Sequence, residues 1–219
     1  MVKVAENLKQ IKADIPDFQG KIIAVTKYVD ESKIIEAYEA GLRDFGENKA
    51  QDALAKMANL PEELIKNSTW HFIGHLQSNK VRKVVGKFEY IHSVDTLELA
   101  KKISTVAKEL GIIQKILIEV NISEEKTKFG TSKTEIEEIF KNLETLDGIR
   151  ILGLMTMAPH TSNEVFLRKV FTDLHGLMYN IQHKYQVELS ELSMGMSSDY
   201  KIAVEAGSTM IRLGQRLFR

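Results

Sequence analysis

Short apolar segments and longer amphipathic segments alternate along the whole chain. The segment 22–27 (Ile-Ile-Ala-Val-Thr-Lys) begins with a run of apolar and β-branched residues, which is typical of a strand buried on both faces. Similar short segments recur up to the end of the chain. The predicted strands are 22–27, 44–48, 70–74, 90–94, 115–121, 151–157, 189–196 and 210–213.

Helical periodicity fills most of the intervals between these strands, and a helix is predicted at 76–85. A loop is predicted around Pro61, and a further helix at 4–15, before the first strand. Most of the helical segments are preceded by residues that favour a helix N-terminus. The candidate caps are Asp30, Glu31 or Ser32; Asp95; Ser132 with Glu135 as a capping box; Thr161 or Ser162; and Ser197, Ser198 or Asp199.

Repeated strand–helix units with short loops predict parallel strands joined by right-handed crossovers. About eight such units in 219 residues favour a (β/α)8 barrel of the TIM type, forming a single domain over 1–219. An open doubly wound sheet is the competing interpretation, but no Gly-x-Gly-x-x-Gly follows the first strand. Only a few residues follow the last strand, so we expect the extra N-terminal helix to cover the gap left by a short final helix.

Composition excludes several classes of function. The 30 basic and 30 acidic residues balance, which argues against a nucleic-acid partner. The chain has no cysteine, so it has no disulfide, no thiolate metal site and no cysteine nucleophile. Its first residues are charged, and no apolar run approaches the roughly 18 residues of a membrane span. We therefore expect a cytoplasmic monomer with no membrane partner.

The ends of all strands of a barrel face one shared mouth, where ligands bind. Lys27, at the end of the first predicted strand, has two interpretations. It is either a solvated ammonium or an amine that forms a Schiff base with a carbonyl ligand. The second role requires a neutral amine, so the lysine pKa must fall below its reference of about 10.4 through burial or a nearby cation. Lys27 alone does not decide between them.

Other polar or small residues fall at the remaining strand ends. Each is also consistent with a structural role, such as a turn, a cap or core packing, but together they form a rim that can hold a small molecule. They are Glu47, Asn48, His75, Asn121, Thr156, Met157, Met196, Ser197, Arg212 and Gly214.

Two stretches near the C-terminus favour an anion site. The segment 194–199 (Met-Gly-Met-Ser-Ser-Asp) places hydroxyl and backbone N–H groups at a predicted helix start. In 211–214, Gly214 allows the backbone to approach an anion closely. Barrel enzymes often bind phosphate at the loops after strands seven and eight. Arg212 keeps its charge and could pair with a carboxylate, a phosphate or a ring nitrogen.

The chain resembles the pyridoxal phosphate homeostasis proteins, which are single-domain relatives of the alanine racemase barrel. The matching motifs run through nearly the whole sequence, in order and at strand ends, and 70–80 and 192–197 are the most specific of them. They are Ala-Val-Thr-Lys (24–27), Phe-Gly-Glu-Asn (45–48), Trp-His-Phe-Ile-Gly-His-Leu-Gln-Ser-Asn-Lys (70–80), Gly-Leu-Met-Thr-Met-Ala-Pro (153–159), Leu-Ser-Met-Gly-Met-Ser (192–197) and Gly-Ser-Thr-Met-Ile-Arg-Leu-Gly (207–214).

The resemblance implies that Lys27 holds pyridoxal 5′-phosphate (PLP) covalently as a Schiff base. It assigns the phosphate to Ser197, Gly214 and neighbouring backbone N–H groups, with Ser198 as a weaker candidate. It also implies that Arg212 faces the pyridine nitrogen. The resemblance further implies that Asn48 lines the cofactor.

An arginine at the pyridine nitrogen leaves that nitrogen unprotonated, so the ring is a weak electron sink. Racemisation also needs two acid–base groups, and in the racemase relatives the second comes from a C-terminal β-domain for which no segment remains here. We therefore expect a non-catalytic carrier, without catalytic or metal-binding residues, that contributes to intracellular PLP and amino-acid homeostasis and supplies apo PLP-dependent enzymes. A PLP-dependent amino-acid racemase and a cofactor-free phosphosugar-type barrel enzyme are the alternatives.

Overall fold

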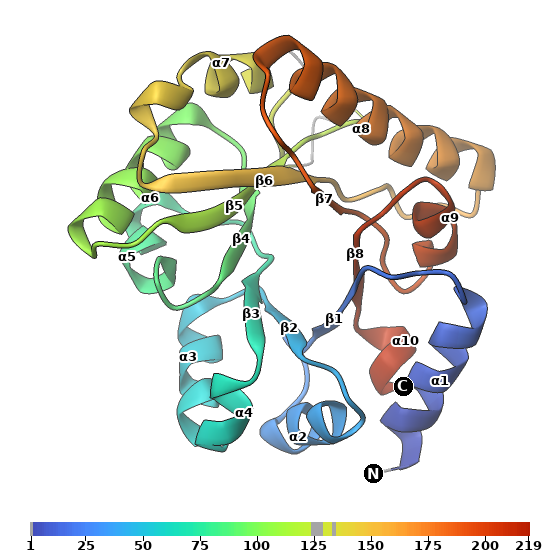
Figure 1. Cartoon of the computed structure of the whole chain (residues 1–219). Coiled ribbons are helices and arrows are strands. Elements are labelled where there is room, and N and C mark those ends of the chain that lie inside the picture. The colour runs from blue at the N-terminus through green and yellow to red at the C-terminus, as the bar shows by residue number, and fades with distance from the viewer. Residues whose placement is uncertain (1, 124–128, 133–134) are drawn as a thin grey trace.

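The computed structural model describes residues 2–123, 129–132 and 135–219. Eight strands form a closed barrel in chain order, and every neighbouring pair is parallel (Figure 1). Because β1 pairs with both β2 and β8, the barrel is confirmed over the open sheet. The strands are β1 Lys21–Val25, β2 Asp44–Glu47, β3 Thr69–Phe72, β4 Tyr90–Val94, β5 Gln114–Glu119, β6 Ile149–Met155, β7 Glu191–Ser193 and β8 Met210–Leu213.

The helices form the outer layer around this barrel (Figure 1). In the described residues they are α1 Val2–Asp14, α2 Glu31–Glu39, α3 Ala50–Asn59, α4 Glu62–Lys66, α5 Val81–Val84, α6 Leu97–Glu109, α7 Glu135–Lys141, α8 Glu164–Tyr185, α9 Tyr200–Glu205 and α10 Gln215–Phe218, with 3-10 turns η1 Ser78–Lys80 and η2 Leu143–Thr145. Two sequence predictions were wrong here. The helix expected at 76–85 is only the turn η1 followed by the single-turn α5, and α4 was expected as a loop.

Two predicted helix starts are confirmed. The Asp30 carboxylate accepts the Lys33 N–H at 3.2 Å and caps α2. Before α7, the Glu135 N–H donates to the Ser132 hydroxyl at 3.2 Å, and the Glu135 carboxylate accepts the Ser132 N–H at 2.9 Å. These reciprocal bonds are the capping box that the sequence predicted.

The caps of α6 and α8 differ from the predicted ones. Thr96, and not Asp95, caps α6, and Asn163, rather than Thr161 or Ser162, caps α8. In both cases the capping oxygen accepts the backbone N–H three residues further along the chain. Each helix therefore begins slightly later than the apolar pattern indicates, because that bond defines its first turn.

The N-terminal helix α1 lies beside the short last helix α10, so the two ends of the chain are neighbours (Figure 1). The Asn7 side chain donates to the Leu217 carbonyl at 2.9 Å. Val4, Leu8 and Ile11 of α1 are buried in the main core. The extra helix thus covers the barrel where the final helix is short, as the sequence predicted.

Polar and apolar side chains share the barrel interior. A small apolar cluster is separate from the main core and takes one residue from each of five strands. It lies inside the barrel, because strands on opposite sides of a closed barrel meet only there. Its members are Ile23, Tyr90, Leu117, Met155 and Met210. Buried polar residues of other strands, described below, lie among the same strands.

Candidate functional site

Lys27 lies beyond the C-terminal end of β1. The strand ends at Val25, so Lys27 is in the following turn and not in the strand as predicted. The turn is closed by the Val29 N–H, which donates to the Thr26 carbonyl at 3.1 Å. The Lys27 side chain is exposed, and its Nζ lies 5.0 Å from the centroid of the Tyr28 ring. Among the described residues, no carboxylate forms an ion pair with this amine, so it is accessible to a ligand.

A buried ion pair holds the backbone just before Lys27. The Lys56 ammonium, from α3, donates to the Glu47 carboxylate at 2.9 Å and to the Thr26 carbonyl at 2.7 Å. The Thr26 hydroxyl also donates to the Glu47 carboxylate, at 2.7 Å. Glu47 is 1% exposed. One carboxylate and one ammonium therefore connect β2 and α3 to Thr26, and these bonds fix the backbone from which the Lys27 turn begins.

Asn48, at the end of β2, packs against the loop after β3. A Cβ atom on Gly74 would lie 2.2 Å from the Asn48 carbonyl oxygen, so only glycine allows this close approach. The Asn48 side chain is half-buried at this end of the barrel. Next to Gly74, the His75 ring stacks on Phe129 with centroids 4.0 Å apart. The loop after β3 is therefore in contact with the loop after β2 and with Phe129, which follows β5.

The loops after β7 and β8 meet at Ser197. Its hydroxyl oxygen accepts the Gly214 N–H at 3.3 Å and the Arg216 N–H at 3.1 Å. One hydroxyl and two backbone N–H groups thus converge at one point, and hydroxyl and backbone N–H groups are donors of the kind that phosphate sites use. Ser198 is exposed, and no hydrogen bond joins its side chain to another described residue.

The turn before Ser197 requires a glycine. Gly195 has a φ of 95°, and a Cβ atom there would lie 2.6 Å from the Ala203 Cβ. The predicted helix start at 197–199 is only partly right, because α9 begins at Tyr200 and Asp199 makes no side-chain cap. The Asp199 carboxylate instead accepts the Met196 N–H, so it shapes the loop rather than the helix.

Arg212 is a buried cation at this end of the barrel, with 4% of its surface exposed. Its Nη1 donates to the Ser193 hydroxyl at 2.6 Å, and its Nη2 donates to the Thr156 carbonyl at 2.9 Å. Burial lowers the pKa of Arg212 to about 10, against the opposing effects of Glu119 and Asp199, so the charge persists at neutral pH. The other three of its five N–H groups have no hydrogen-bond partner within the described chain.

Comparison with known proteins agrees with this geometry. A family model, alanine racemase N-terminal domain, matches residues 2–219. A pyridoxal phosphate homeostasis protein of Synechocystis sp. is 42% identical over 198 residues, which are 90% of each chain. The protein of that name from Aquifex aeolicus is 40% identical over 199 residues, 91% of this chain and 86% of the relative. The chain belongs to the family of pyridoxal phosphate homeostasis proteins.

Solved structures place the chain in the same family and fold. PipY of Synechococcus elongatus PCC7942, solved with PLP bound, has a TM-score of 0.89 and 38% identity, covering 99% of this chain and 100% of PipY. An alanine racemase of Clostridium difficile 630 has a TM-score of 0.80 but only 17% identity, and the match covers 99% of this chain and 56% of the racemase. The second likeness shows that the fold is that of the alanine racemase barrel, and nothing more.

Glu119 is a feature of this site that the sequence reasoning missed. It ends β5 and is 2% exposed. Burial and the nearby charge of Asp95 raise the pKa of Glu119 from 4.5 to about 7, although the Arg212 charge opposes them. Burial also raises the pKa of Asp95. A glutamate within the apolar run 116–120 was the available signal, because such a residue has to be buried if the strand is.

The structure therefore brings only some of the predicted residues into direct contact. Ser197 and Gly214 are hydrogen-bonded to each other, and Arg212 is bonded to Thr156. The side chains of the other predicted cofactor residues make no hydrogen bond with these within the described chain, although all of them follow strand ends. They are Lys27, Asn48 and Ser198. A ligand that touched all of these groups would have to span the mouth.

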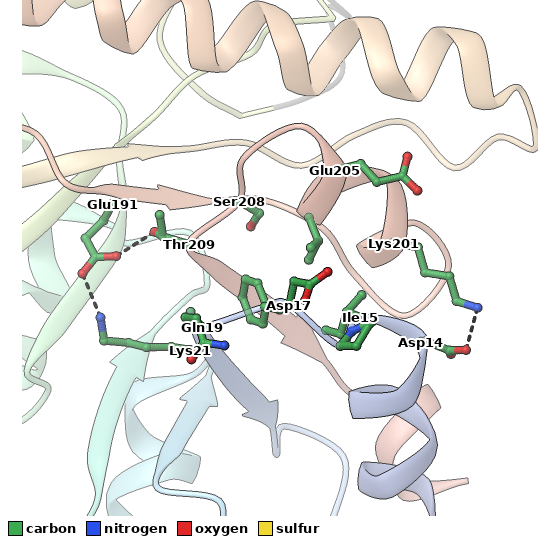
Figure 2. A pocket seen from close by; sticks show the side chains of 14 residues that line it. Asp14, Ile15, Asp17, Gln19, Lys21, Glu191, Lys201, Glu205, Ser208 and Thr209 are labelled. Carbon is green, nitrogen blue, oxygen red and sulfur yellow. Dashed lines mark hydrogen bonds and ion pairs between the residues drawn. The ribbon is translucent and has the colours of Figure 1, made fainter.

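A cavity of about 820 Å³ lies at the opposite end of the barrel (Figure 2). It is lined by the segment 14–20, the starts of β1 and β7, α9 and the two residues before β8. Lys21 pairs there with Glu191 at 2.8 Å, and Lys201 pairs with Asp14 at 2.8 Å. Because barrels keep their ligand sites at the C-terminal ends of strands, we do not assign the cofactor to this cavity.

Among the residues that the structure describes, no group of three or more His, Cys, Asp or Glu residues is placed to hold a metal ion. No helix in the same part of the chain is long and apolar enough to span a bilayer.

Proposed function

We propose that this protein binds PLP covalently through Lys27 and holds it without performing catalysis, so that it buffers PLP and supplies it to apo PLP-dependent enzymes in the cytoplasm. The names of its relatives and the PLP bound to PipY support this role. The structural observation that carries the proposal is the cluster of one hydroxyl and two N–H groups at Ser197. It lies at the same end of the barrel as the accessible Lys27 amine.

The residues of this end fit the chemical groups of PLP. When bound, PLP supplies an aldehyde whose carbon condenses with a primary amine, with loss of one water molecule. Lys27 is the amine, and the ion pair of Lys56 with Glu47 fixes the backbone that presents it. Ser197 and the N–H group of Gly214 would bind the phosphate, and Ser198 has a free hydroxyl beside them.

The ring of the cofactor is assigned to Arg212 and Asn48. Arg212 has three N–H groups without a described partner and would donate one to the pyridine nitrogen. A cation that only donates leaves that nitrogen without a proton, so the ring withdraws electrons weakly. This arrangement favours storage of the cofactor over carbanion chemistry. The racemase alternative has in its favour only a likeness of fold, at 17% identity.

Reductive trapping tests the attachment. The protein is incubated with PLP, reduced with borohydride and mapped by peptide mass spectrometry. We expect the label on Lys27, and none in Lys27→Ala. Lys49→Ala, which removes an exposed lysine after β2, is the matched control and should label normally. Label on a different lysine, or on none, would overturn the assignment.

Turnover separates a carrier from an enzyme. We expect no conversion of L-alanine to D-alanine by the PLP-loaded protein. Measurable conversion that disappears in Lys27→Ala would favour the racemase instead. A protein that stays colourless after incubation with PLP would favour a cofactor-free barrel enzyme, because the bound imine absorbs visible light.

A further inference from the structure

A chain of hydrogen-bonded polar side chains crosses the interior of the barrel. Arg212 Nη1 donates to the Ser193 hydroxyl at 2.6 Å, and Ser193 Oγ lies 2.9 Å from His92 Nδ1. His92 Nε2 lies 2.9 Å from His71 Nδ1, and His71 Nε2 lies 3.0 Å from an Asp44 carboxylate oxygen. The two histidines and Ser193 are fully buried. The chain connects β8, near the mouth, with the start of β2 at the opposite end.

The two ends of this chain fix the direction of every bond in it. Asp44, as a carboxylate, only accepts, so the proton of His71 must be on Nε2. If His71 is neutral, its Nδ1 accepts from the Nε2–H of His92. The Nδ1 of His92 then accepts from Ser193, whose oxygen receives the N–H of Arg212. All bonds therefore run from the arginine to the carboxylate, and each histidine is confined to one tautomer.

Both histidines are held neutral by their surroundings. Burial lowers the pKa of His71, although Asp44 opposes this effect. Burial, together with the charges of Arg212 and Lys21, lowers the pKa of His92 well below 6.5. A protonated histidine would donate through both ring nitrogens, so His92 would donate to Ser193 instead of accepting from it. The Ser193 proton would then have no acceptor in this series of hydrogen bonds. Neutral histidines therefore keep all the bonds running in one direction, from the arginine to the carboxylate.

The end of the chain at Asp44 is enclosed by groups from several other strands. The Tyr90 ring of β4 stacks on His71 with centroids 4.8 Å apart. Lys21 of β1 and Glu191 of β7 form an ion pair that also lines the cavity of Figure 2, and their charges act on His71 in opposite directions. Stacking and a paired charge therefore flank this end, although the Asp44 side chain itself is only half-buried.

We propose that Ser193, His92 and His71 are positioning residues for Arg212. The hydroxyl of Ser193 is committed to His92, so its oxygen is left as a fixed acceptor for Nη1 of Arg212, and the guanidinium cannot turn. This inference rests on the proposed function in one respect: the remaining N–H groups of Arg212 would be held toward the ring of PLP. The series of hydrogen bonds from Arg212 to Asp44 exists without the cofactor.

Nitrogen NMR of the PLP-free protein tests the chain directly. Long-range ¹H–¹⁵N spectra distinguish the Nδ1–H and Nε2–H tautomers and the charged ring, and the other four of the six histidines serve as internal references. We expect His71 and His92 as neutral Nε2–H tautomers at pH 7. A charged ring, or an Nδ1–H tautomer at His92, would overturn the proposal.

A pair of substitutions at His92 separates positioning from packing. The oxygen of His92→Asn takes the place of Nδ1 and keeps an acceptor for Ser193, whereas His92→Gln places its amide near Nε2 and keeps only the partner of His71. We expect His92→Gln and Ser193→Ala to shift the absorption of bound PLP and to weaken its affinity about tenfold. Ser193→Ala removes the acceptor of the charged Arg212, and His92→Gln removes the group that holds the Ser193 hydroxyl in place. His92→Asn should remain close to the wild type.

The outcomes are distinguishable from those of the proposed function. Equal spectra and affinities for all three variants would refute positioning, even if the tautomers are as expected. If His92→Asn behaves like His92→Gln, packing explains the loss and the proposal is wrong. Absence of label at Lys27 with the expected tautomers would refute PLP attachment and leave the hydrogen-bonded chain standing.

Discussion

Replacement of Glu119 by glutamine should remove one contribution to the pH dependence of the free energy of unfolding. Glu119 is buried near Asp95 and Arg212, and no described residue donates a hydrogen bond to its carboxyl group. Glutamine has nearly the same volume and cannot ionise. The substitution therefore removes the ionisation of this group while it changes the packing little.

The magnitude follows from the pKa of Glu119, which burial and Asp95 raise from 4.5 to about 7. Below pH 4.5 both the folded and the unfolded protein carry the proton, so ionisation of Glu119 does not change the free energy of unfolding. Between the two values the unfolded chain releases its proton first, and the free energy of unfolding falls as pH rises. A tenfold change in proton affinity corresponds to about 1.4 kcal/mol, so the complete loss is on the order of 3 kcal/mol.

Urea unfolding of the PLP-free protein at a series of pH values from about 4.5 to about 8 measures this effect. We expect the free energy of unfolding of Glu119→Gln, minus that of the wild type, to increase with pH by on the order of 3 kcal/mol. Glu137→Gln is the control, because the hydrogen bond from Lys184 lowers the pKa of the half-buried Glu137 below 4.5. Its linked change has the opposite sign and lies at lower pH, so its difference from the wild type should stay nearly constant over this range. Parallel pH profiles for Glu119→Gln and the wild type would refute the reasoning.

Three further substitutions test other parts of the site. Lys56→Met leaves the Glu47 carboxylate buried without its cation, so we expect a loss of about 3 kcal/mol or more in urea unfolding, most of it recovered when Glu47→Met is added. An unaffected Lys56→Met would contradict the ion pair. Gly74→Ala places a Cβ atom 2.2 Å from the Asn48 carbonyl oxygen, so we expect a loss of about 1–3 kcal/mol in the free energy of unfolding. Equilibrium titration should also show weaker PLP binding. Unchanged PLP affinity would mean that the Asn48 loop does not contact the cofactor. Arg212→Glu should change the absorption spectrum of bound PLP while the phosphate remains held, and an identical spectrum would show that Arg212 does not touch the ring.

Much of the fold was readable in the sequence because parallel strands are buried on both faces. Each strand then appears as a short apolar run between amphipathic segments, and this pattern identified all eight strands. Strand ends were less accurate. The run 189–196 contributes only Glu191–Ser193 to the barrel, because its pairing with β6 and β8 ends at Ser193.

The candidate site was predictable only in part. Residues that follow strand ends, such as Lys27 and Ser197, were identified because all strand ends of a barrel face the same side. Glu119 and His92 were missed because they lie inside apolar runs, where the sequence shows no partner. His92 bonds to Ser193, which is 101 residues away in the chain.

The sequence by itself determined the order of strands and helices, the closure expected of about eight units and the residues at the mouth. These depend on local periodicity and on the rule that parallel strands end together. Only the tertiary structure decided which polar groups are paired, which are desolvated and which way hydrogen bonds run across the interior. Those properties depend on the partners that the closed barrel brings together from distant strands, and the energy of a buried charge or hydrogen bond is set by such partners.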